Sequence, residues 1–309
     1  MTSAQHASAN PSDTPNAAAA GTWQLGDRTV NRLGFGAMRV TGTGAFHNGT
    51  PRDRATSIAV VRRAVELGVN HIDTAAFYFS ALRSANEIIN AALAPLGADA
   101  EHVLVATKVG PRRDRAGGWE AAATPADLRG DVEQNLRELG RDHLDLVYLR
   151  NMRYESIAEH FGALADLREE GLIRDLGVSG ISTAQLTEAR EIAPVVSVEN
   201  KFGLDDTESI DVMKACGELG IAFVPFFAIA GARSGAPAPE EVSEDARVLK
   251  VAEAHGVTSQ QIRLAWTLSQ GSHVLAIPGT GDLAHLEANI AAGAIRLTSE
   301  DLELLTSGD

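Results

Sequence analysis

Short apolar runs alternate with amphipathic segments along nearly the whole chain. The runs predict buried strands, and apolar residues spaced three or four positions apart, such as Ile58, Val61 and Val65, predict helices. The expected strands are 33–36, 70–73, 103–108, 145–150, 173–179, 195–199, 221–226 and 274–277. The expected helices are 54–67, 84–93, one opening at 124–125, one ending at 170, 183–192, 208–219, 243–255, 259–269, 282–291 and one from 298.

Residues at the element boundaries support this division. Gly68 follows the first helix in the place of a C-cap glycine. Thr124 and Pro125 supply a hydroxyl cap and a proline at the first helical position of a later helix. Before the first strand, residues 22–25 and 28–30 flank a Gly-Asp turn, which predicts a small hairpin.

Eight strand–helix units in one uninterrupted series predict an α/β fold. We expect a (β/α)8 TIM barrel with an N-terminal β-hairpin and extra C-terminal helices. A doubly wound sheet is the alternative, but it requires a glycine fingerprint and a helix directly after its first strand. Residues 33–38 are too short for that fingerprint. The expected domain covers residues 22–309, after a disordered tail of residues 1–21 that lacks large apolar residues beyond Met1.

Composition excludes several classes of partner. The formal net charge of −14 argues against nucleic acid and anionic membrane surfaces, both of which need basic patches. No apolar run is long enough to span a membrane, and the first residues lack the pattern of a secretory signal. Cys216 is the only cysteine, so we expect no internal disulfide, no metal cluster of thiolates and a reducing, cytoplasmic setting.

Polar residues close several predicted strands: Asp73, Lys108, Arg150, Ser179 and Glu199-Asn200. In a barrel the carboxyl ends of the strands meet at one mouth, where active sites form. Taken alone, each residue has an ordinary explanation as a helix cap, a turn residue or a solvated rim charge. Together they indicate a site, because a buried lysine needs a partner and the aspartate lies on the neighbouring strand.

Tyr78, five residues after Asp73, adds a proton donor. A free tyrosine has a pKa of about 10 and is a poor acid at neutral pH, but a nearby cation lowers that pKa. We expect Asp73 to hold Lys108 in place and Lys108 to touch the Tyr78 oxygen. Tyr78 then donates a proton to a carbonyl oxygen as hydride reaches its carbon. The combination predicts carbonyl reduction.

These residues and several motifs resemble the aldo-keto reductase family. The motifs are Leu33-Gly34-Phe35-Gly36, Gly68-Val69-Asn70-His71-Ile72-Asp73-Thr74-Ala75 with Tyr78, Ala106-Thr107-Lys108, Gly177-Val178-Ser179, and Ile277-Pro278-Gly279-Thr280 with His285-Leu286-Glu287-Ala288-Asn289. They run in order from about residue 22 to residue 307. The resemblance implies a hairpin-plugged barrel that reduces a small aldehyde or ketone with NADPH. It also implies that Asp73, Tyr78 and Lys108 are catalytic.

The chain departs from the family pattern around the reacting groups. Arg150 stands where the family has a histidine, and its surroundings resemble a bacterial subgroup that includes pyridoxal reductases. We expect Arg150 to replace that histidine as a permanent cation that donates to the substrate oxygen. The family's Ser-Asn pair at the nicotinamide is here Ser179-Gly180, and its glutamine is Glu199. Phe226 matches the aromatic residue that stacks on the nicotinamide.

The adenosine end also departs from the pattern. Gly279 and His285 stand at the family's frequent lysine and arginine, with Thr280 beside them, and Ala288 stands at its glutamate. NADPH is still expected over NADH, because the subgroup with Ile-Pro-Gly-Thr resembles NADPH users. The residues implied in cofactor binding are Gly36, Met38, Ser179, Glu199, Phe226, Ile277, Gly279, Thr280, His285 and Asn289.

Apolar residues in or near the mouth-side loops predict a pocket for a small carbonyl compound. They are Phe46, Phe77, Trp119, Met152 and Phe227. Pyridoxal, other aromatic aldehydes and a ketone all remain open as substrates. The alternative function is an NADPH-binding sensor or regulatory barrel with little turnover. The intact Asp73, Tyr78 and Lys108 favour the enzyme.

Overall fold

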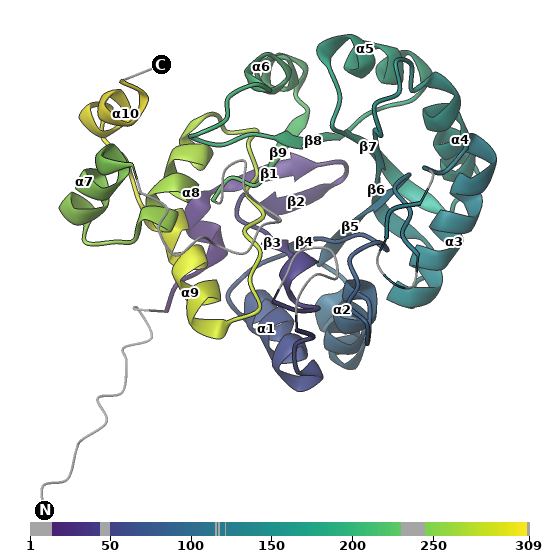
Figure 1. The fold of residues 1–309 in the computed structure, drawn as a ribbon, viewed down its shortest axis with the longest axis horizontal. Helices are drawn as coiled ribbons and strands as arrows, with labels where there is room; N and C mark the ends of the chain where they lie inside the picture. Colours follow the sequence, from purple (N-terminus) through teal and green to yellow (C-terminus); the bar gives the residue numbers. More distant parts are fainter. Residues whose placement is uncertain are drawn as a thin grey trace, which may run out of the picture.

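The structure is a computed structural model, and it describes residues 14–43, 50–114, 116, 118–120, 122–229 and 245–307. Within these residues, seven parallel strands stand side by side in chain order and curve into a barrel wall (Figure 1). The strands are β3 (Phe35–Gly36), β4 (His71–Asp73), β5 (Leu104–Val109), β6 (Leu144–Arg150), β7 (Ile173–Ser179), β8 (Ser197–Lys201) and β9 (Ala222–Phe226).

The segment that begins at Val274 closes the wall between β9 and β3. The backbone N–H of Leu275 donates to the Phe223 oxygen at 2.9 Å, and that of Ala276 donates to the Arg32 oxygen at 2.8 Å. The predicted eighth strand therefore has its expected place, although it forms isolated bridges and not a regular ladder. Its partner β3 is only two residues long, and the proline after Ile277 has no N–H to donate. The barrel prediction is confirmed.

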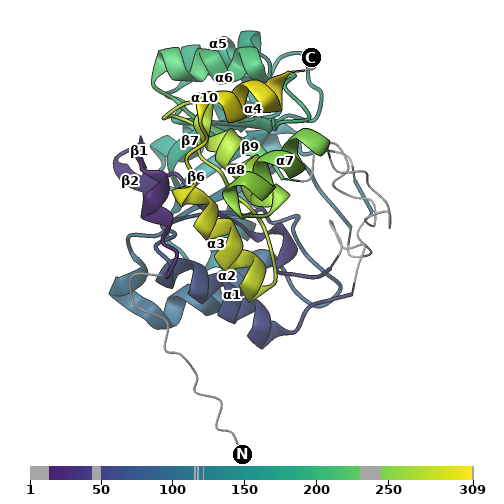
Figure 2. The ribbon, with the colours of Figure 1, turned by 90° about the vertical axis from the view of Figure 1, so that its left-hand side faces the viewer.

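The predicted hairpin, β1 (Thr22–Leu25) and β2 (Arg28–Asn31), covers the amino-terminal end of the barrel (Figure 2). Leu25 and Val30 are buried in the barrel interior together with residues from β5, β6 and β9. Because this end is closed by apolar side chains, ligands have access from the opposite end, where the strands finish.

Helices surround the barrel wall (Figure 1). They are α1 (Arg54–Glu66), α2 (Ala85–Leu93), α3 (Leu128–Leu139), α4 (Ala158–Glu169), α5 (Thr183–Ile192), α6 (Ile210–Leu219), α7 (Ala246–His255), α8 (Ser259–Ser269), α9 (Leu283–Ala291) and α10 (Ser299–Thr306). The extra helices α7 and α10 lie together outside the ring, joined by a hydrogen bond of 2.9 Å between the side chains of His255 and Asp301. Among the described residues, no helix is long and apolar enough to cross a membrane.

The prediction of a disordered tail over residues 1–21 is wrong for its last part. Residues 17–20 form a short 3-10 helix, whose start is capped by the Asn16 side chain at 2.9 Å from the Ala18 nitrogen. The Ala17 nitrogen donates to the Leu67 oxygen at 2.8 Å, and Ala17 is fully buried. Small side chains fit here because the space is narrow: Ala20 is also buried, and a Cβ atom on Gly293 would lie 3.2 Å from its Cβ. Composition alone does not reveal this packing. Residues 1–13 lie outside the described part.

Candidate active site

Asp73 and Lys108 meet at the carboxyl ends of β4 and β5. The Lys108 ammonium donates to the Asp73 carboxylate and, at 3.1 Å, to the Thr74 carbonyl oxygen. Both side chains are buried. Burial lowers the pKa of Lys108, but the carboxylates of Asp73 and Glu199 outweigh that effect and raise the pKa well above its usual value. The lysine is therefore a permanent cation inside the barrel.

Tyr78 lies beside this pair, on the loop after β4. Its ring centroid is 5.2 Å from the Lys108 ammonium nitrogen. Burial raises the pKa of Tyr78, Lys108 lowers it, and Asp73 and Glu199 raise it further. The predicted effect of Lys108 thus has the right sign, but the net pKa lies above the usual value and not below it. Tyr78 keeps its proton throughout the neutral range.

Glu199, at the end of β8, is a second carboxyl group against the same lysine. Its Oε2 atom lies 3.3 Å from the Lys108 nitrogen, without hydrogen-bond geometry. Burial and the nearby Asp73 raise the pKa of Glu199 to about 8. Burial also raises the pKa of Asp73, which contacts the same lysine. A carboxyl group whose pKa is raised in this way can hold a proton near neutral pH, and it then donates as well as accepts a hydrogen bond.

Arg150, at the end of β6, lies over the ring of Phe226, with its guanidinium carbon 5.0 Å from the ring centroid. Its Nη1 atom donates to the Ser179 hydroxyl at 3.4 Å. A Cβ atom placed on Gly180 would lie 2.1 Å from the same Nη1 atom. The arginine therefore occupies the space that a side chain at position 180 would need. The two departures from the family pattern, Arg150 and Gly180, thus depend on each other.

Two adjoining cavities open onto this cluster, and Met38, Tyr78, Glu199 and Phe226 line both. The first has a volume of about 200 Å³. It is lined by six of the residues predicted for the cofactor: Gly36, Met38, Glu199, Phe226, Ile277 and Gly279. The second has a volume of about 280 Å³. It is lined by Phe77, Trp119, Met152 and Phe227 of the predicted substrate pocket, together with Arg150 and Ser179.

Phe227 owes its place in both cavities to an unusual backbone conformation. Consecutive side chains of an extended strand point in opposite directions. Phe227 has a φ of 64°, and it reaches the same cavities as Phe226. The predicted pocket residue Phe46 lies outside the described residues.

The remaining predicted cofactor residues lie beyond the two cavities, just before α9 and within it. The Thr280 hydroxyl accepts from the Asp282 nitrogen at 3.1 Å, and Asn289 is buried. The His285 side chain is 79% exposed, so it points into solvent.

Arg52, which the sequence analysis did not single out, lies against the same segment. A Cβ atom on Gly281 would be 2.1 Å from its Nε atom. That Nε atom is buried, and within the described residues it has no hydrogen-bond partner. Arg52 also lowers the pKa of Asp282 slightly, after the stronger effect of the His285 backbone. The segment therefore has an adjacent cation, although Gly279 and His285 stand where the family often has a lysine and an arginine.

A model of the aldo/keto reductase family matches residues 32–308. The chain belongs to the aldo/keto reductase family. It is 40% identical over 291 residues to the pyridoxine 4-dehydrogenase of Escherichia coli strain K12, with 92% of this chain and 96% of that protein covered. It is 31% identical over 299 residues to a probable aldo-keto reductase 1 of Glycine max, with 88% and 84% covered.

Solved aldo-keto reductases share the fold of this reductase. One from Klebsiella pneumoniae, in complex with NADPH, aligns with a TM-score of 0.75 and 26% identity over 92% of this chain and 93% of its own. A thermostable aldo-keto reductase in complex with the inhibitor epalrestat aligns with a TM-score of 0.76 and 27% identity, over 93% and 98%. As a family member, the protein is an oxidoreductase that acts on carbonyl or alcohol groups.

A buried polar chain supports the strand ends of the reductase. The Thr74 hydroxyl donates to Asn86 at 2.9 Å, and Asn86 donates to the side-chain oxygen of Asn135 at 2.9 Å. The Thr107 hydroxyl donates to that same oxygen at 2.6 Å. Thr74 follows Asp73 and Thr107 precedes Lys108, so α2 and α3 hold the backbone on both sides of the ion pair. No sequence pattern indicated this network.

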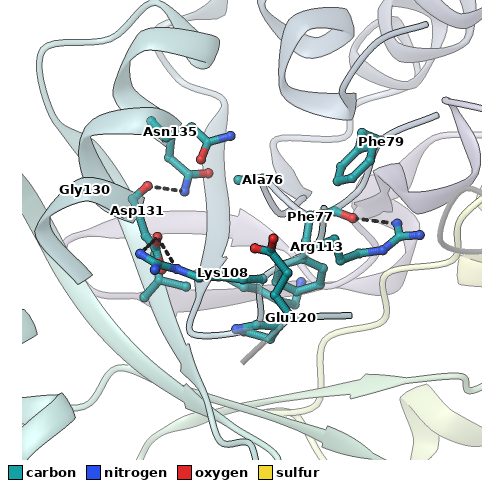
Figure 3. Close-up of a pocket in the computed structure, with 13 residues that line it drawn as sticks. Ala76, Phe77, Phe79, Lys108, Arg113, Glu120, Gly130, Asp131 and Asn135 are labelled. Atoms are coloured by element: carbon teal, nitrogen blue, oxygen red, sulfur yellow. Dashed lines mark hydrogen bonds and ion pairs between the residues drawn. The ribbon is translucent and has the colours of Figure 1, made fainter. Parts of the chain in front are cut away.

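A third cavity of the reductase, of about 310 Å³, adjoins the substrate cavity (Figure 3). It shares Phe77, Lys108 and Pro111 with that cavity. Two arginines in its lining form hydrogen bonds within the protein. Arg112 donates to Asp131 at 2.7 Å. Arg113 donates to the Phe77 oxygen at 3.2 Å (Figure 3). These bonds fix the loop that carries the aromatic wall of the substrate cavity.

Proposed function

We propose that this protein reduces a small aldehyde or ketone to an alcohol with NADPH, and that the same groups carry the reverse reaction. The observation that carries the proposal is the position of Tyr78. It lies between the cavity lined by predicted cofactor residues and the aromatic cavity, with the Asp73–Lys108 pair behind it.

Each catalytic side chain has one role in this proposal. Tyr78 donates a proton to the carbonyl oxygen, and its raised pKa ensures that the proton is present. Lys108 stabilises the negative charge that remains on the tyrosine oxygen, which is why it must stay charged. Asp73 holds Lys108 in position through their buried ion pair.

Arg150 supplies a second cation, on the substrate side. It lines the aromatic cavity and is held there by Phe226 and Ser179. Negative charge develops on the carbonyl oxygen during reduction, and a fixed guanidinium stabilises that charge. In this role Arg150 takes the place of the family's histidine without titrating near neutral pH.

The residues that line the first cavity suit the nicotinamide end of NADPH, which would supply the hydride. Phe226 offers a ring face for the nicotinamide, and Ser179 and Glu199 offer polar atoms for its carboxamide. Arg52 offers a guanidinium beside the segment where the family binds the phosphate of the adenosine. These residues favour NADPH over NADH.

The second cavity suits an aromatic aldehyde. Phe77 and Trp119 pack against each other with ring centroids 6.1 Å apart, and Met152 and Phe227 complete an apolar wall. Similarity to a pyridoxine 4-dehydrogenase adds pyridoxal to the first candidates.

The test is NADPH consumption by the full chain with a panel of aldehydes and ketones that includes pyridoxal. We expect turnover with NADPH, weaker turnover with NADH, and an alcohol product in equal amount to the NADPH consumed. Tight NADPH binding without turnover on any member of the panel would instead favour the alternative, a sensor or regulatory barrel.

A further inference from the structure

Glu199 lies at the point where the two cavities meet. It lines both of them and is only 1% exposed. Its Oε2 atom is 3.3 Å from the Lys108 nitrogen, yet the strong hydrogen bond of that lysine goes to Asp73. Among the described residues, Oε2 has no hydrogen-bond partner. Glu199 is therefore a buried carboxyl group that contacts Lys108 through Oε2 and also lines the place proposed for the nicotinamide.

The charged groups that face Glu199 are one carboxyl group and two cations. The carboxyl group is Asp73 on β4, whose own pKa is raised by burial, and the cations are Lys108 on β5 and Arg150 on β6. Burial also raises the pKa of the nearby phenols Tyr78 and Tyr148, so both stay neutral. Burial and then Asp73 raise the pKa of Glu199, whereas Lys108 and Arg150 lower it by less, so opposing effects set this pKa. The proton on Glu199 is therefore sensitive to any further charge that enters the site.

The nicotinamide ring changes charge during the reaction. It is neutral in NADPH and carries one positive charge in NADP⁺. A cation placed next to a buried carboxyl favours the ionised form of that carboxyl. The two cofactor forms must therefore act differently on Glu199, and a glutamine at the same position has no proton to lose.

We propose that Glu199 is a redox-linked proton site, protonated in the free and NADPH-bound enzyme and ionised when NADP⁺ is bound. The inference rests on the proposed function, because it uses the proposed nicotinamide position. Glu199 is a positioning residue in this scheme, since no bond of the substrate forms or breaks at it. The carboxylate pairs with the nicotinamide cation, and the acid donates to the carboxamide of NADPH.

The sign of the pH dependence follows. NADP⁺ binding releases the Glu199 proton, so raising the pH strengthens NADP⁺ binding by up to about tenfold per pH unit below the pKa of free Glu199. NADPH binding releases no proton from Glu199. The adenosine phosphate titrates near pH 6 in both cofactors, so the ratio of the two affinities isolates the nicotinamide end.

The experiment is isothermal titration calorimetry of the full chain with NADP⁺ and with NADPH, in buffers of different ionisation enthalpy at pH 7. We expect NADP⁺ to release close to one proton more than NADPH does. In Glu199→Gln that difference disappears, and the NADP⁺/NADPH affinity ratio no longer changes between pH 6 and pH 8. Asp175→Asn is the matched control. It removes a half-buried carboxyl group of raised pKa from β7, near the hairpin. In this variant, NADP⁺ should still release more protons than NADPH, as in the wild-type protein.

Equal proton release by NADP⁺ and NADPH in the wild-type protein would overturn the inference, and this result does not depend on any variant folding. If NADP⁺ releases more protons than NADPH in the wild-type protein and equally so in Glu199→Gln, the inference is overturned as well. The proposed function fails separately. If the affinity ratio changes with pH as predicted but no carbonyl in the panel is reduced, the inference stands and the proposed reduction does not.

Discussion

At the scale of single residues, the site differs from the family pattern through changes that depend on one another. Arg150 fills the volume left by Gly180, and Glu199 shares Lys108 with Asp73. Strand-end positions predicted which of these residues meet at the mouth. They did not predict that an arginine would fold back over Phe226, because that contact depends on the shape of the finished barrel.

Turnover should be insensitive to pH across the range where a histidine titrates. Arg150 does not titrate there, and burial lowers the pKa of His71 to about 4, so it is already neutral. We expect kcat/KM for the carbonyl substrate, measured at saturating NADPH, to be flat between about pH 6 and 7. It should fall as the pH rises through about 8, because the active acid form of Glu199 is then lost. A steep limb centred near pH 6.5 would contradict this assignment of Arg150.

Gly180→Ala tests the link between the two departures. The added Cβ collides with the Arg150 guanidinium, so NADPH affinity and kcat/KM should both fall. Part of this loss comes from the backbone at position 180, where φ is 70°. Any residue with a Cβ atom is destabilised in this left-handed conformation. A double-mutant cycle with Arg150→His removes that common part. We expect a coupling free energy of about 0.5–3 kcal/mol. Purely additive losses would show that the two positions act independently.

At the scale of elements, helices α2 and α3 position the ion pair through the asparagines of the buried polar chain. Helix periodicity predicted where these helices lie. It did not predict their asparagines as partners of Thr74 and Thr107, because polar residues on a helix are ordinarily exposed. The same limit explains the missed helix at residues 17–20, where small alanines fill a narrow space.

Asn135→Ala should weaken both the fold and the reaction. It leaves Thr107 and Asn86 without their partner, at about 1–3 kcal/mol for each buried polar group. Urea unfolding gives the loss in free energy of unfolding, and kcat should fall because Lys108 and Asp73 lose support. Asn90→Ala is the control, since the half-buried Asn90 makes only a 3.3 Å bond to the Glu138 oxygen. Equal effects of the two variants would argue against a special role for the network.

At the scale of the whole molecule, barrel closure joins the first and last strand–helix units. It brings Arg52, before α1, against Gly281, before α9. The alternation of strands and helices predicted the barrel and its hairpin, because each unit carries a periodic signal of its own. No local pattern relates residue 52 to residue 281, so this contact appears only once the ring is closed.

Arg52→Ala should therefore weaken NADPH binding while leaving NADH binding unchanged. A charge-assisted bond to the extra phosphate contributes about 1.5–3 kcal/mol, which corresponds to roughly a tenfold to hundredfold change in Kd. Arg54→Ala is the matched control, because Arg54 is already paired with Glu87 at 2.9 Å. Equal losses for both cofactors in Arg52→Ala would place the arginine in general folding and not in phosphate recognition.

The most direct test of the central claim is the turnover number of Tyr78→Phe with a carbonyl substrate that the wild-type protein reduces. We expect kcat to fall by about 10²–10⁴-fold, because the proton donor is lost, with the Kd for NADPH almost unchanged. Tyr154→Phe, which removes a hydroxyl bonded to the Ala123 oxygen at 3.2 Å, should keep wild-type turnover. Wild-type kcat in Tyr78→Phe would contradict the proposal that Tyr78 delivers the proton.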